Sequence, residues 1–202
     1  MSDRSSPTGW LDALERDAPD LVGSFRALDD GRFIALRREV RRFAGAGSAP
    51  RLAREHAAVM AHLDGLIAAA SPEVLAAPGG EEDWNVAQAL GHAIAARQGL
   101  VLAAQMAALG RWPAEAPIVV PGVPGPLDAD SDALRERLAK SQRFVERAAE
   151  RIAGHELEPC PLDHPLVGRL RCGEWLLFAG VHDLMHAEQL ERLVRPVGAA
   201  PS

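Results

Sequence analysis

Residues 173–194 read GEWLLFAGVHDLMHAEQLERLV, and this stretch decides the class of fold. Leucine, alanine, glutamate and methionine are common in it, and all four favour helix over strand. One set of its residues recurs at alternating steps of four and three: Trp175, Ala179, His182, His186, Gln189 and Leu193. This spacing places the set along one face of a helix, where it can pack against other helices. The stretch therefore predicts a long helix with two histidines in its packed seam.

Three further segments repeat this spacing, at about 51–70, 85–109 and 131–153. Clusters of glycine and proline separate them, the longest being the proline-rich loop at 110–129. The composition agrees, because the chain is rich in alanine and only 4% aromatic. Four such helices around one core form a four-helix bundle, so the predicted fold class is all-α.

Shorter apolar patterns precede the bundle, within the first 45 residues. We expect them to form extra N-terminal helices that pack on the outside of the bundle or against a second copy of the chain. The predicted organisation is an N-terminal helical extension at 1–49, a metal-binding bundle at 50–195 and a tail at 196–202.

Composition and charge exclude several classes of protein. The formal net charge is −6, which argues against a nucleic-acid binder. No apolar stretch approaches the length of a membrane span, and the polar N-terminus has no signal-peptide core. A cytoplasmic location is expected, where Cys160 and Cys172 stay reduced and serve as buried or idle thiols. The alternative is a disulfide between Cys160 and Cys172.

His182 and His186 are the strongest functional candidates, because a spacing of four lets two imidazoles on one helix face share an ion. A third histidine, His92, lies on another predicted core stripe beside the small residues Ala96 and Gly99. These small neighbours leave room for a ligand, a cavity or close helix packing. A buried imidazole without a partner is costly, so the trio predicts a metal site. The alternative is a buried network of hydrogen-bonded histidines without metal.

The order of the helices decides whether the three histidines can meet. The 110–129 loop is long enough to return along the bundle, which favours an up-down-down-up order. His92 and His186 then both lie about 10 Å from the same end, at 1.5 Å per residue. A plain up-down order places His186 nearer to about 20 Å from that end.

Three imidazoles on one divalent ion leave a coordination position open for water or substrate. Such an ion lowers the pKa of a bound water or thiol. Zinc suits three nitrogens best, and nickel, iron and manganese are also compatible. Three further side chains are candidates for the pocket: Gln189, Gln88 and His62. Gln189 either orients an imidazole or a water, or simply contacts solvent, and Gln88 could play the same orienting part. His62 lines the site, acts as a proton shuttle or is a surface histidine. Asp183 and Glu188 are expected on a solvated face.

Three stretches resemble the DinB/YfiT-like superfamily of small metal-binding bundles. They are DWNV at 83–86 followed by ALGH at 89–92, HPLVGRL at 164–170, and HDLMHAEQ at 182–189. With the helix spacing, the likeness covers about residues 50–194. The chain departs from the family pattern in its long N-terminal segment and in Asn85, where serine or threonine is common.

The resemblance implies an up-down-down-up bundle, often a homodimer, with metal ligands at His92, His182 and His186. Its better-understood branches are thiol transferases that use low-molecular-weight thiols such as bacillithiol or mycothiol, and one related branch isomerises maleylpyruvate with mycothiol. The leading hypothesis is therefore a zinc- or nickel-dependent transferase that activates a small thiol. The alternatives are a hydrolase that uses a hydroxide held on the metal, a non-catalytic stress-response module that binds metal or a small ligand, and a purely structural bundle. The residues do not identify a catalytic group or a substrate.

Overall fold

A computed structural model describes residues 9–28, 33–79, 83–116, 119, 124–165 and 167–194 of the chain. The predicted tail at 196–202 lies outside these residues. The described part is all-helical, with eight helices: α1 (Gly9–Glu15), α2 (Pro19–Arg26), α3 (Phe33–Phe43), α4 (Ala49–Ala69), α5 (Pro72–Ala76), α6 (Val86–Ala108), α7 (Ser131–Ile152) and α8 (Cys172–Val194).

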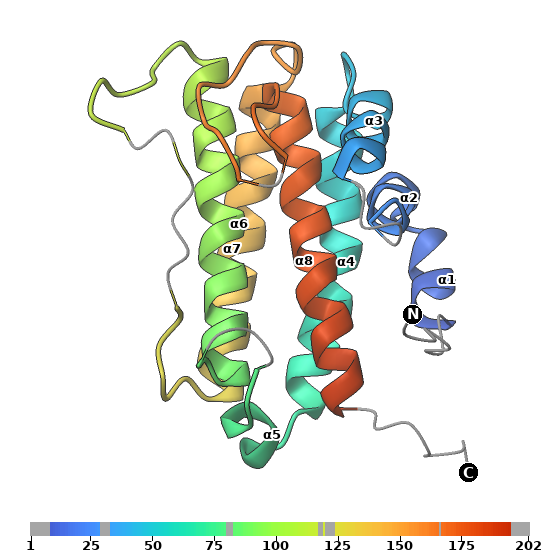
Figure 1. Cartoon of the computed structure of the whole chain (residues 1–202), viewed down its shortest axis with the longest axis vertical. Helices are drawn as coiled ribbons and strands as arrows, with labels where there is room; N and C mark the ends of the chain where they lie inside the picture. Colours follow the sequence, from blue (N-terminus) through green and yellow to red (C-terminus); the bar gives the residue numbers. More distant parts are fainter. Residues whose placement is uncertain are drawn as a thin grey trace.

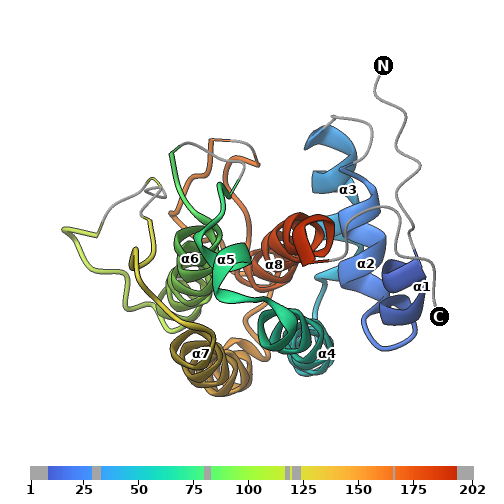
Figure 2. The ribbon, with the colours of Figure 1, turned by 90° about the horizontal axis from the view of Figure 1, so that it is seen from below.

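The four long helices α4, α6, α7 and α8 form the bundle, as the spacing predicts. In Figure 1, α4 and α8 run down the page while α6 and α7 run up it. Figure 2 shows α6 between α7 and α8, with α4 diagonally opposite. The up-down-down-up order is therefore confirmed. The segment between α6 and α7 makes this order possible, because α6 ends and α7 begins at opposite ends of the bundle (Figure 1).

Side-chain caps set the starts of α6 and α7. Asn85 precedes α6, and its side chain accepts a hydrogen bond from the backbone N–H of Gln88 at 2.8 Å. The Gln88 side chain returns the bond by accepting from the Asn85 N–H at 3.1 Å, which completes a capping box. Asp130 caps α7 in the same way through the Ala133 N–H, at 2.8 Å. Asn85 thus performs the capping that serine or threonine provides elsewhere.

The N-terminal helices α1–α3 pack on the outside of the bundle against α4 and α8 (Figure 2). Leu21 and Leu36 of this layer are fully buried. The approach is close at Gly180 of α8, where an added Cβ would lie 2.7 Å from the Leu21 side chain. The helices therefore belong to the same core as the bundle. The predicted division at residue 49 into an extension and a bundle stays a prediction.

The short helix α5 is not predicted by the sequence, because its five residues are too few for a periodic pattern. The Ser71 side chain caps it and Pro72 occupies its first turn. None of the helices in the described ranges is long and apolar enough to span a membrane.

A buried polar layer crosses the centre of the bundle, with one side chain from each long helix: His56, Arg97, Gln142 and Asp183. Arg97 Nε lies 3.2 Å from Asp183 Oδ2, and Arg97 also donates to the Gln142 side-chain oxygen. The expectation that Asp183 faces solvent is wrong, since it is 1% exposed. The physical reason is that α8 is enclosed by α4, α6 and the N-terminal layer. Glu188 forms an ion pair with Arg192 at 2.7 Å on the more accessible part of α8.

Candidate metal centre

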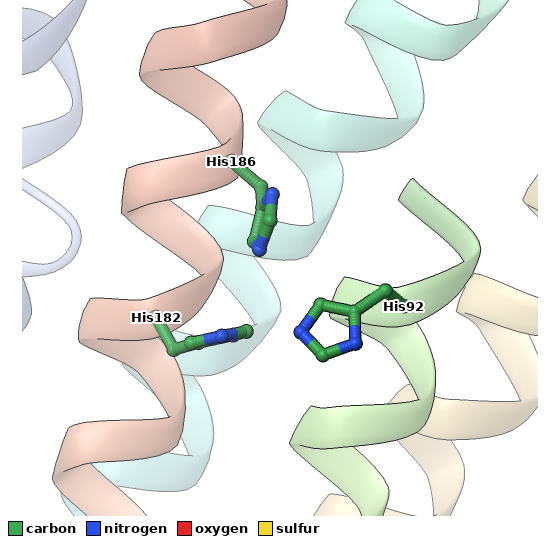
Figure 3. Close-up of side chains that lie close together, drawn as sticks. All are labelled: His92, His182 and His186. Carbon is green, nitrogen blue, oxygen red and sulfur yellow. The ribbon is translucent and has the colours of Figure 1, made fainter. Parts of the chain in front are cut away.

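The fold brings His92 of α6 together with His182 and His186 of α8 (Figure 3). One ring nitrogen from each of the three lies within 4.8 Å of the other two. The ring centroids are 4.8 Å apart for His182 and His186, and 5.6 and 5.8 Å from His92 to these two. Two adjacent antiparallel helices therefore supply an i, i+4 pair and a single histidine that faces it.

The state of His182 suits a metal ligand. Its Nδ1 is buried and has no hydrogen-bond partner among the residues that the structure describes. Burial, followed by the neighbouring His186, His92 and His164, holds the pKa of His182 well below its usual value. The imidazole is thus neutral at pH 7, which leaves a lone pair available to a cation. A buried nitrogen without a partner is the observation that most directly fits a missing ligand.

Two neighbours hold the histidine rings in place. Gln189 Oε1 lies 3.1 Å from His186 Nδ1. If the Nδ1–H of His186 donates to this oxygen, the Nε2 lone pair is left for a ligand. Trp84 packs against His92, with ring centroids 5.1 Å apart. The orientation of two of the three rings is therefore restricted by side chains outside the cluster.

The loop after residue 123 also passes over α6 beside His92. An alanine Cβ at Gly91 would lie 2.8 Å from the Gly125 Cα, and Gly125 N–H donates to the Gln88 carbonyl at 3.0 Å. Only glycine permits backbones to approach this closely. The packed loop holds this turn of α6, and His92 with it.

A family model described as the DinB superfamily matches residues 61–190. This match covers more than half of the chain and contains all three histidines. The chain belongs to the DinB superfamily. No curated protein and no solved structure matches it. The helices α1–α3 and the first half of α4 lie before the matched region.

Two other predicted pocket residues of this DinB chain, Gln88 and His62, have partners outside the three-histidine cluster. The side chain of Gln88 is engaged in the capping box of α6. His62 Nε2 lies 3.2 Å from Glu191 Oε1, and its ring stacks on Trp10 with centroids 5.0 Å apart. The rotation of α4 about its axis turns His62 toward the N-terminal layer. The sequence does not predict this rotation. Gln189 is the predicted neighbour that does contact a histidine of the cluster.

His164 is a neighbour of the cluster that the sequence assigned only to its turn. It packs against Phe178 and Trp175 of α8, with ring centroids 5.2 and 6.3 Å away. It is also among the groups that lower the pKa of His182. The loop that carries it lies between α7 and α8 and has no periodicity, so sequence spacing could not place it.

The two cysteines of this DinB chain are free thiols and are buried. Burial raises the pKa of Cys160 to about 11 and that of Cys172 to about 12. Neither forms a thiolate at neutral pH, which agrees with the expectation of buried thiols without a reactive role.

Proposed function

We propose that this DinB-superfamily chain is a metal-dependent transferase that activates a low-molecular-weight thiol at His92, His182 and His186. The observation that carries the proposal is the convergence of three imidazoles without a fourth histidine, cysteine or carboxylate in the group that the structure describes. Catalytic sites typically hold their metal with three protein ligands and leave one position for a reactant.

The donor set favours zinc or nickel, because neutral imidazoles suit both. A divalent ion held by His92, His182 and His186 would lower the pKa of a thiol, so that the thiolate would be available at neutral pH. The chain's own side chains orient the ligands: Gln189 holds His186, and Trp84 restricts His92.

The transferred sulfur comes from an outside molecule in this proposal. The chain's own thiols are buried and have raised pKa values, so they do not supply a nucleophile. The outside thiol loses its proton to solvent, and its sulfur forms a bond to an electrophilic carbon of the substrate. The leaving group departs with its electron pair. The resemblance to thiol-transferring branches of the superfamily supports this assignment.

The test begins with elemental analysis of the untagged protein beside its His182→Ala variant. We expect about one equivalent of zinc or nickel in the wild type and a large loss in the variant, because two imidazoles bind far more weakly than three. A Gln105→Ala variant, changed elsewhere on α6, is the control and should keep its metal. If none of the proteins binds metal, even after reconstitution, the proposed metal site is wrong.

Turnover then separates the reactions that share this site. Metal-loaded protein is given pairs of thiol and electrophile, and the loss of free thiol is followed. Consumption of both reactants, absent in His182→Ala, supports the transferase. Activity that needs no thiol instead identifies a hydrolase. A loaded protein that turns over neither substrate class is a binding module.

A further inference from the structure

A cavity of about 400 Å³ runs along α6 and begins at His92. Its floor is the stripe of small residues Ala96, Gly99 and Ala103, which the sequence marked as leaving room for a ligand or close packing. None of the helices in the described part of the chain contributes to this cavity apart from α6 itself. Trp112 of the loop after α6 and Leu162 of the loop before α8 form walls of the cavity instead.

The cavity is apolar. Apart from the His92 imidazole and the Trp112 indole N–H, its described lining consists of hydrocarbon or thioether side chains and glycine, and no charged side chain contributes. Leu102 and Val119 also line it, although they are 44% and 53% exposed. Large apolar side chains that stay exposed around a hollow indicate a binding site. The volume lies within the range of small-molecule pockets.

We infer that this cavity binds an uncharged apolar group, an aromatic ring or a branched alkyl chain, of the substrate that reacts at the histidine cluster. His92 belongs to both the cavity and the cluster, so a molecule in the cavity has one end beside the candidate metal position. A charged group is disfavoured in the cavity because none of the described lining side chains is acidic or basic apart from His92. The assignment of a substrate rests on the proposed function, whereas the binding of an apolar group rests on the cavity alone.

Gly99 provides a direct test of the cavity. A Cβ added there would meet no atom within 4 Å, so this position has open space for the start of a side chain. Gly99→Leu should therefore fold and occupy the space. Gly65 of α4 is a matched control, because it is also a helical glycine with nothing within 4 Å of an added Cβ. Gly65→Leu makes the same chemical change outside the cavity.

The experiment titrates toluene into metal-free protein and follows the methyl resonance of Met106, which lines the cavity. A Met106→Leu variant assigns the resonance. We expect saturable binding to the wild type and to Gly65→Leu, and binding weaker by about tenfold or more in Gly99→Leu, since the added side chain takes the space of the ring. No saturable shift in the wild type, or equal affinity in wild type and Gly99→Leu, would overturn the inference.

Two further measurements distinguish this inference from the proposed function and from occupation of the cavity by a second copy of the chain. Zinc content is determined on separate portions of the same proteins after reconstitution with zinc. If toluene binds but no metal does, the proposed function is wrong and the cavity remains a binding site. If metal binds but toluene does not, the inference about the cavity is wrong and the proposed function stands. Sedimentation of wild type and Gly99→Leu is the second measurement. A dimer that dissociates on Gly99→Leu, without toluene binding, would show that a second copy occupies the cavity, which overturns the small-molecule inference.

Discussion

At the scale of single residues, the site depends on how each imidazole is held. His182 has a buried Nδ1 without a partner among the described residues, while His186 has Gln189 at 3.1 Å. A histidine that can rotate freely loses conformational entropy when it binds an ion, so a fixed ring binds more tightly. Side chains that orient metal ligands commonly change metal affinity by about 10- to 100-fold.

Gln189→Leu removes the oxygen that faces His186 Nδ1 and keeps a similar side-chain volume. We expect zinc affinity to fall by about tenfold or more, measured by competition with a chromophoric chelator. Gln189→Glu is the control, because its carboxylate still accepts from Nδ1–H and should keep the affinity close to that of the wild type. Equal affinities in all three proteins would show that Gln189 does not orient the ring.

At the scale of elements, the N-terminal layer is attached to the bundle through Glu55 of α4. No side chain caps α2 from its own N-terminus. Glu55 Oε2 instead accepts from the backbone N–H groups of Asp20 and Leu21 at 2.9 and 3.0 Å. These are donors of the first turn, which need partners outside the helix. A buried carboxylate of one helix thus completes the start of another.

Glu55 should make stability depend on pH in a specific direction. Burial raises the pKa of Glu55 from 4.5 to about 7, against the lowering effect of the Leu21 N–H. The folded state therefore binds this proton more tightly than the unfolded chain. The resulting stability is complete below pH 4.5 and is lost as the pH rises through about 7.

The contribution of Glu55 is isolated by comparing the pH dependence of unfolding in metal-free wild type and Glu55→Gln. Other titrating groups, such as His56 and Asp183, are present in both proteins, so their contributions cancel. We expect the free energy of unfolding of the wild type, relative to the variant, to fall by about 3 kcal/mol between pH 4.5 and pH 8. Urea unfolding at several pH values measures it. Parallel pH profiles for the two proteins would contradict a raised pKa at Glu55.

At the scale of the whole molecule, the polar layer at the centre of the bundle links all four long helices. His56 Nε2–H donates to the Leu176 carbonyl at 2.8 Å, and its Nδ1 lies 3.4 Å from the Arg97 guanidinium. Burial, then Arg97, lowers the pKa of His56 to about 3, so this imidazole is neutral. The charges of Arg97 and Asp183 face each other. The layer suits one alignment of the helices, the one that brings His92 opposite α8.

Arg97→Met should destabilise the fold by about 3–5 kcal/mol, because it leaves the Asp183 carboxylate buried without its charged partner. The double variant Arg97→Met with Asp183→Leu removes both charges and should recover most of that loss. Urea unfolding at pH 7.5 compares wild type, both single variants and the double variant. Single-variant losses that simply add in the double variant would show that the two charges do not stabilise each other in the fold.

The sequence by itself determined the four long helices, their order and the three histidines that meet. The spacing of three and four residues along Trp175–Leu193 can be read from the sequence alone. So can the length of the 110–129 loop, because its prolines and glycines mark where helix is interrupted. Counting residues from the helix ends then placed His92 and His186 at the same depth, which the bundle confirms.

Only the tertiary structure decided which way the remaining side chains face. The N-terminal layer packs on α8, and His62 contacts Trp10 of this layer and Glu191 of α8. In the centre of the bundle, Asp183 is buried against Arg97. The cavity at Gly99 likewise exists because loops, and not a helix, cover the small residues of α6. Periodicity reports the face of a helix that is apolar, but the partner of each face depends on contacts between segments far apart in the chain.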